Sequence, residues 1–333
     1  MLLNRRTLIL GGLSGTSALV TPSSFAQSTK EPRKLVLGQS VPLTGAADQI
    51  GLAYFNGAKM YFDSINEKNG VAGYKIEVKV LDDGYDAVVA ARNAKQFIDS
   101  KVDALFGFVG TASSDAAAAV AKASGVIFFA PFAASDSLHA PDMTHVFHVR
   151  PALADEAYKV VRHCATLNQD RIAVFAEDDA MGRAGLAAVK EALVDLKRPA
   201  ILAHALSPVN SDKVEAAVAT LMKAQPQAII LFSLFNSSAA FIKKMRRAGY
   251  VGQFLTFSVV GIDPLFSALG KDIGGIVVSQ VVPSPRNTGS PIVREYLDVL
   301  NQTDQAPSYE SIEGYIAARA FAQGVQRSAM GNG

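Results

Sequence analysis

The fold of this chain is decided by the stretch Phe106-Gly107-Phe108-Val109-Gly110-Thr111-Ala112-Ser113-Ser114-Asp115, which is followed by alanine at positions 116–119. The apolar segment 104–109 is typical of a buried strand, and the glycines and alanines predict a loop that enters a helix. Serine and aspartate here are expected to cap that helix. Because ligands bind beyond the carboxyl ends of parallel strands, residues 110–114 are predicted to form a cradle for an anion or carboxylate. The alternative is an ordinary strand-to-helix turn.

The same alternation of strand and helix extends in both directions from this stretch. Strands are predicted at 35–41, 75–81, 126–130, 145–149, 171–176, 201–206, 228–233, 254–260 and 276–282, mostly with helical patterns between them. This order predicts an α/β fold of two doubly wound parallel-sheet lobes joined by a hinge. The chain is expected to change lobe near 149–151 and again near 281–285. The N-terminal lobe would then comprise 34–150 plus 284–333, and the C-terminal lobe 151–283.

Residues 1–26 are predicted to be a signal peptide. Arg5 and Arg6 precede a short apolar segment, 8–20, and Ser24-Phe25-Ala26 offers small residues for cleavage. The adjacent arginines resemble a twin-arginine export signal, although ordinary secretion remains an alternative. The apolar segment is too short for a membrane span. We therefore expect an exported, periplasmic protein.

Composition and motifs favour binding over catalysis. The chain has 32 Lys and Arg against 30 Asp and Glu, and two of the arginines lie in the predicted signal peptide. The rest carries no net charge, and no basic patch predicts a nucleic-acid partner. No dinucleotide-binding, P-loop or nucleophile-elbow motif is present, so no cofactor is expected. His145 and His148 would point to opposite faces of a strand, which argues against a metal site.

Several short motifs, in order along the chain, resemble one known family. They are Pro42-Leu43-Thr44-Gly45, Phe55-Asn56-Gly57-Ala58, Asp82-Asp83, Gly110-Thr111-Ala112-Ser113-Ser114 and Glu313-Gly314-Tyr315. The chain resembles the Leu/Ile/Val-binding type of periplasmic substrate-binding proteins, which feed ABC importers. The resemblance implies the type I periplasmic binding fold, no enzymatic activity and a small-molecule ligand clamped between two lobes. It also implies ABC permease subunits as partners, and contact with the membrane only through the permease.

The resemblance also suggests which residues bind the ligand. Ser114 would hold its carboxylate, and the loop Ala133-Ala134-Ser135 would supply backbone groups and a hydroxyl. The side-chain pocket would be lined by Ile50 from the first lobe and by Met181 and Leu234 from the second.

Two departures from the family pattern bear on the ligand and on the chain's end. Ser258 stands where amino-acid binders carry a carboxylate for the ligand's ammonium, and a buried ammonium without a counter-charge costs several kcal/mol. A standard amino acid would need another acid, such as Glu177, Asp178 or Glu310. A small carboxylate or apolar-aromatic compound is therefore expected ahead of an aliphatic amino acid. The chain also stops soon after the helix that holds Tyr315, so we expect either truncation or a branch without the third crossover.

Two alternatives to a transport function remain open. A ligand sensor that regulates a partner would use the same fold. An enzyme on an α/β scaffold ranks third.

Overall fold

Two five-stranded parallel sheets form the centre of the protein in a computed structural model that describes residues 33–331. Each pair of neighbouring strands runs parallel. The first sheet has the order β2 (Tyr74–Asp82), β1 (Arg33–Val41), β3 (Ala104–Phe106), β4 (Phe128–Phe129) and β5 (Val146–Phe147). The second has the order β10 (Ile276–Val278), β9 (Gln253–Thr256), β8 (Ala228–Phe232), β6 (Ile172–Glu177) and β7 (Ala203–Ser207). The predicted α/β fold with two parallel-sheet lobes is confirmed.

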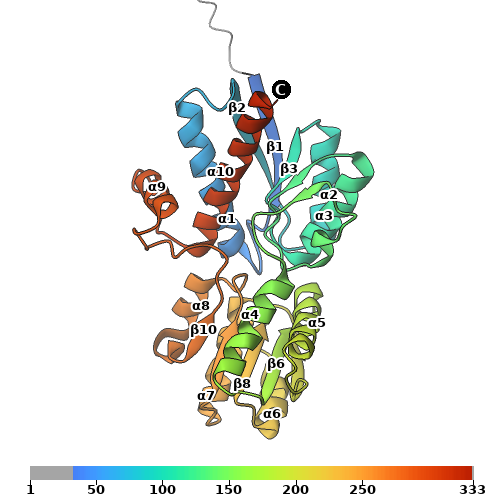
Figure 1. Cartoon of the computed structure of the whole chain (residues 1–333), viewed down its shortest axis with the longest axis vertical. Helices are drawn as coiled ribbons and strands as arrows, with labels where there is room; N and C mark the ends of the chain where they lie inside the picture. The colour runs from blue at the N-terminus through green and yellow to red at the C-terminus, as the bar shows by residue number, and fades with distance from the viewer. Residues whose placement is uncertain (1–32, 332–333) are drawn as a thin grey trace, which may run out of the picture. The chain divides into compact units, whose positions relative to one another are not determined.

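Helices flank both sheets (Figure 1). The first lobe, defined by the first sheet, also contains α1 (Asp48–Glu67), α2 (Ala87–Asp99), α3 (Thr111–Ser124), the short η1 (Ser137–His139), α9 (Pro291–Leu300) and α10 (Tyr309–Met330). The second lobe, defined by the second sheet, contains α4 (Leu153–Thr166), α5 (Ala180–Asp195), α6 (Glu215–Ala224), α7 (Phe235–Arg247), α8 (Ile262–Leu269) and η2 (Gly270–Ile273). The chain passes between lobes after β5 and again after β10. The exact domain boundaries at 150/151 and 283/284 stay predictions.

Burial explains the composition of the strands. Every residue of the central strands β6 and β8 is buried, because helices cover both faces of a parallel sheet. The edge strand β2 mixes buried, half-buried and exposed positions instead. Strands with uninterrupted apolar runs therefore take the middle of the sheet.

The last helix of the described chain packs against the first. A Cβ atom at Gly57 of α1 would overlap the carbonyl oxygen of Ser311, and one at Gly314 of α10 would overlap that of Tyr54. Figure 1 shows α10 beside α1 although they are far apart in sequence. These two glycines let the helix backbones touch, which fixes the returning chain on the first lobe.

The stretch at 106–115 forms a strand, a loop and a helix as predicted, but its capping differs. Gly110 is the N-cap of α3 with φ of 109°, and no side chain caps the helix. The expectation that serine or aspartate would cap it is wrong, because α3 already begins at Thr111 and places Ser113, Ser114 and Asp115 inside the helix. Asp115 instead accepts hydrogen bonds from the hydroxyls of Ser135 (2.7 Å) and Ser137 (2.9 Å). The N–H groups of the first turn are thus left without a side-chain partner from the cap.

The predicted signal peptide, residues 1–26, lies outside the described residues. Within residues 33–331, no helix combines the length and the apolar character that crossing a bilayer would require.

Candidate ligand-binding site

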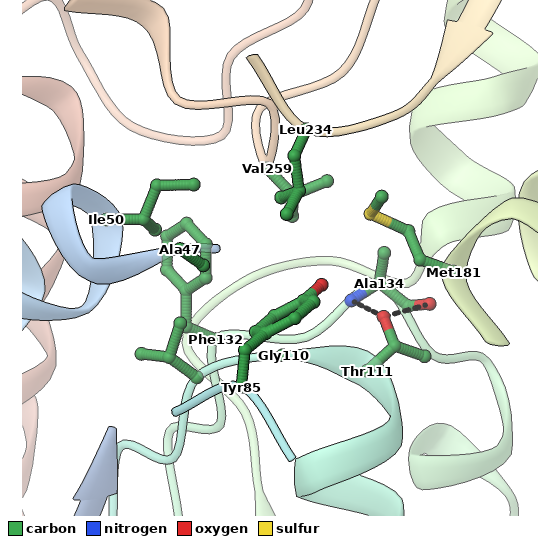
Figure 2. A pocket seen from close by; sticks show the side chains of 11 residues that line it. Ala47, Ile50, Tyr85, Gly110, Thr111, Phe132, Ala134, Met181, Leu234 and Val259 are labelled. Carbon is green, nitrogen blue, oxygen red and sulfur yellow. Dashed lines mark hydrogen bonds between the residues drawn. The ribbon is translucent and has the colours of Figure 1, made fainter. Parts of the chain in front are cut away.

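A small pocket lies where loops from both lobes meet (Figure 2). The space within it, open solvent included, is about 260 Å³. Its lining residues are Ala47, Ile50, Tyr85, Val109, Gly110, Thr111, Phe132, Ala134, Met181, Leu234 and Val259. A lining of this composition suits a largely apolar ligand.

The lining residues occupy the ends of strands and the starts of helices. In the first lobe, Ala47 is the N-cap of α1, while Gly110 follows β3 and Phe132 follows β4. In the second lobe, Met181 lies in the first turn of α5 and Leu234 is the N-cap of α7. The pocket therefore sits beyond the carboxyl ends of both sheets, where α/β folds bind ligands.

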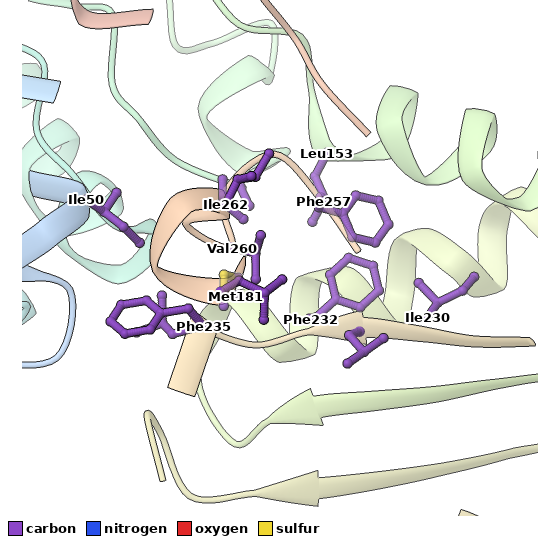
Figure 3. Close-up of a cluster of buried hydrophobic side chains, with 14 of the residues drawn as sticks. Ile50, Leu153, Met181, Ile230, Phe232, Phe235, Phe257, Val260 and Ile262 are labelled. Carbon is purple, nitrogen blue, oxygen red and sulfur yellow. The ribbon is translucent and has the colours of Figure 1, made fainter. Parts of the chain in front are cut away.

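The apolar wall of the pocket is continuous with the hydrophobic core. Ile50 and Met181 belong to one buried cluster with Phe232 and Phe257, whose rings stack at 4.2 Å between centroids (Figure 3). Close packing holds such side chains in defined positions. The second-lobe face of the pocket is therefore a pre-formed surface.

The N-terminus of α3 forms the polar end of the pocket. Gly110 and Thr111 line it, and the first N–H groups of a helix have no acceptor within the helix. The Thr111 hydroxyl forms two hydrogen bonds with the neighbouring loop. It donates to the Ala134 carbonyl and accepts from the Ala134 N–H, both at 3.2 Å. This arrangement can bind one carboxylate through backbone N–H groups and the helix dipole.

The structure brings together four of the predicted ligand-binding residues: Ile50, Ala134, Met181 and Leu234. Ala133 and Ser135 flank Ala134 without lining the pocket, and the Ser135 hydroxyl is bound to Asp115. Ser114 is fully buried, and its hydroxyl donates to the Phe108 carbonyl at 3.3 Å. The ligand contacts assigned to all the predicted site residues, those that line the pocket included, stay predictions.

Ser258, also a predicted site residue, belongs to a buried polar network beside the pocket. Its hydroxyl donates to Glu156 Oε1 at 2.8 Å and accepts from Arg150 at 3.1 Å. Arg150 also forms a two-pronged ion pair with Glu313, at 2.8 and 3.1 Å, and its guanidinium lies 4.3 Å from the ring centre of Phe132. The acid Glu156 therefore lies next to Ser258, but this carboxylate is already hydrogen-bonded to protein groups.

The three acids considered as partners for a ligand ammonium do not line the pocket. Asp178 forms an exposed ion pair with Arg183, and Glu310 accepts a hydrogen bond from the N–H of Ile262 at 3.2 Å. Glu177 is buried, and its Oε1 accepts from the N–H of Asn210 at 2.8 Å while Oε2 has no partner among the described residues. Burial raises the pKa of Glu177 to about 7.

Sequence reasoning missed Tyr85 and Phe132 as pocket residues. Tyr85 follows Asp82-Asp83-Gly84 at the end of β2, so its position after a strand was an available signal. Phe132 lies in the predicted loop 131–135 but was not assigned to the site. Only the folded loops show that these side chains converge.

No metal site emerges within residues 33–331, where no three metal-binding side chains cluster. The His145 ring is within hydrogen-bond distance of the Ala118 carbonyl, at 3.0 Å, and that of His148 lies 2.9 Å from the Leu138 carbonyl. The two histidines thus contact different elements, although neither lies within a strand.

Comparison with known proteins identifies the family. Residues 34–332 match the family described as periplasmic binding protein. An amino acid binding protein of Pseudomonas aeruginosa is 25% identical over 261 residues, which cover 77% of this chain and 69% of that protein. A Leu/Ile/Val-binding protein homolog of Brucella melitensis is 21% identical over 88% of this chain and 79% of its own length. A crystal structure of a possible leucine/isoleucine/valine-binding protein from Rhodopirellula baltica superposes with a TM-score of 0.84 at 28% identity, over 90% of this chain and 85% of that one.

The fold and the pocket define a two-lobed α/β binding protein. The chain belongs to the periplasmic binding protein family, in its Leu/Ile/Val-binding, type I branch. Proteins of this family bind solutes and are not enzymes, so the chain is a solute-binding protein.

Proposed function

We propose that this protein binds a small apolar monocarboxylate between its lobes and delivers it to an ABC importer. The proposal depends on one observation: the pocket offers the N-terminus of α3 for a carboxylate, while no acidic side chain lines it. Because an ammonium buried without a counter-charge is costly, a carboxylate lacking an α-amino group fits better than an amino acid. An aliphatic amino acid is the second choice.

The apolar lining of the pocket and the names of the relatives support an apolar ligand. Relatives are named for leucine, isoleucine and valine, whose side chains are branched and aliphatic. Here Ile50, Met181, Leu234 and Val259 supply an apolar lining of the corresponding kind. We infer a branched aliphatic or small aromatic acid, delivered by an exported protein to permease subunits.

Calorimetric titration tests the ligand class. The purified protein is titrated with isocaproate, phenylacetate, α-ketoisocaproate and leucine, and each complex is also heated to measure Tm. We expect at least one of the three amine-free acids to bind more tightly than leucine and to raise Tm, because a ligand that binds only the native state stabilises it. Tight binding of leucine alone would overturn the proposal.

Delivery is tested separately in cells. Deleting the gene is expected to reduce uptake of the labelled acid identified by titration, and restoring the gene is expected to return it. Unchanged uptake with unchanged expression of the neighbouring genes would contradict delivery and favour a sensor.

A further inference from the structure

Tyr85 provides the free polar side chain of the pocket. Of the eleven residues that line it, Tyr85 and Thr111 carry polar side chains, and the Thr111 hydroxyl is bound to the backbone of Ala134. Figure 2 shows the Tyr85 hydroxyl pointing into the cavity, with no hydrogen bond to the residues drawn. The hydroxyl is therefore available to a ligand.

The position of the ring places this hydroxyl next to the carboxylate cradle. A Cβ atom at Gly110 would lie 2.7 Å from Cε2 of Tyr85, the ring carbon adjacent to the one that bears the hydroxyl. Gly110 is the N-cap of α3. A ligand whose carboxylate is held there would present its α-carbon, rather than the far end of its side chain, to Tyr85.

The backbone holds Tyr85 in a conformation that non-glycine residues seldom adopt. Its φ is 68°, in the left-handed region, and its N–H donates to Asp83 Oδ1 at 2.9 Å. The Ser40 hydroxyl donates to the other oxygen of Asp83 at 2.7 Å. Strained backbone persists where its surroundings hold it, often at binding sites. In this conformation the ring lies against Gly110.

The hydroxyl of Tyr85 keeps its proton. Burial, together with the neighbouring acidic groups of Asp179, Glu177 and Asp83, raises the pKa of Tyr85 far above its usual value. The phenol therefore stays protonated at physiological pH and can both donate and accept a hydrogen bond.

We propose that the Tyr85 hydroxyl binds an uncharged hydroxyl or keto group on the α-carbon of the bound carboxylate. Tyr85 thereby becomes a specificity-determining residue. The inference rests on the proposed function, because it takes the carboxylate to lie at the N-terminus of α3.

Matched ligands test this role. Isocaproate and α-hydroxyisocaproate differ by one hydroxyl, and both are titrated into the wild-type protein and the Tyr85→Phe variant. We expect the hydroxyl to raise affinity for the wild type by roughly five- to tenfold, and Tyr85→Phe to abolish that gain while leaving isocaproate unchanged. Tyr158→Phe, at an exposed position on α4, is the matched control and is expected to retain the gain.

The outcomes separate this inference from the proposed function. If Tyr85→Phe weakens both monocarboxylates equally, or neither, the ring does not recognise the substituent and the inference is overturned. If folded wild-type protein binds none of these acids, the proposed function is wrong, and the inference that rests on it is wrong as well.

Discussion

Glu177 shows how one buried carboxyl group couples this protein to pH. It ends β6, is fully buried, and makes one hydrogen bond through Oε1 while Oε2 has no partner among the described residues. Burial disfavours the charged form, so the pKa of Glu177 rises from its usual 4.5 to about 7. The native state therefore holds this proton more strongly than the unfolded chain does.

Stability is expected to depend on pH through this residue. The contribution of protonated Glu177 to the free energy of unfolding is complete below about pH 4.5. It is lost as the pH rises to about 7, because the unfolded chain releases the proton first. The free energy of unfolding of Glu177→Gln is expected to exceed that of the wild type by about 1–3 kcal/mol at pH 8. At pH 4.5 the two values are expected to differ little. Urea unfolding at both pH values measures this. Glu191→Gln, at an exposed position on α5, serves as the control. A difference between wild type and Glu177→Gln that does not change with pH would refute the assignment.

At the scale of elements, the contact between α1 and α10 depends on two glycines. Gly57 and Gly314 each face the backbone of the opposite helix, at a distance that leaves no room for a methyl group. Glycine normally weakens a helix interior by about 1 kcal/mol relative to alanine. Their presence here is explained by packing rather than by helix propensity.

Alanine substitutions in α10 separate packing from propensity. Gly314→Ala is expected to lower the free energy of unfolding by about 1–3 kcal/mol, because the added methyl group would overlap the carbonyl of Tyr54. Gly324→Ala lies in the same helix, where a Cβ atom meets nothing within 4 Å. This control is expected to be neutral or to stabilise by up to about 1 kcal/mol. Similar effects at both positions, measured by urea unfolding, would rule out the close contact.

At the scale of the whole binding unit, one buried polar network connects the two lobes. Arg150 lies in the first crossing segment, Glu313 on α10 of the first lobe and Ser258 after β9 of the second. The side chains of Arg150 and Glu313 are only 2% and 6% exposed. Because Arg150 also stacks on Phe132, which lines the pocket, the network joins the lobe junction to the ligand site.

Breaking the buried ion pair is expected to be costly. Glu313→Gln leaves Arg150 without its two-pronged partner and should lower the free energy of unfolding by about 3–5 kcal/mol. The exposed pair Lys95–Asp99 supplies the comparison, since Asp99→Asn should change stability by less than about 1 kcal/mol. Chemical unfolding of both variants tests this prediction. Equal small effects would mean that the ion pair of Arg150 and Glu313 contributes nothing to the free energy of unfolding.

The success of sequence reasoning varied with the range of the interactions involved. Strand-helix alternation and the loop at Gly110 depend on local patterns and were correctly predicted. Ile50, Ala134, Met181 and Leu234 were assigned to the site from a resemblance, and the structure places them around one pocket. The cap of α3 was wrong because glycine with positive φ began the helix before any serine could cap it.

The sequence by itself determined the α/β class and the order of the elements, because these follow from hydrophobic period and turn residues. The tertiary structure alone decided which side chains meet. Ser258 faces Glu156, 102 positions away, and Arg150 faces Glu313, 163 positions away. Tyr85, which follows β2 and donates its N–H to Asp83, lies against Gly110, 25 positions away. Such contacts depend on how sheets and loops pack in space, and no local pattern along the chain carries that information.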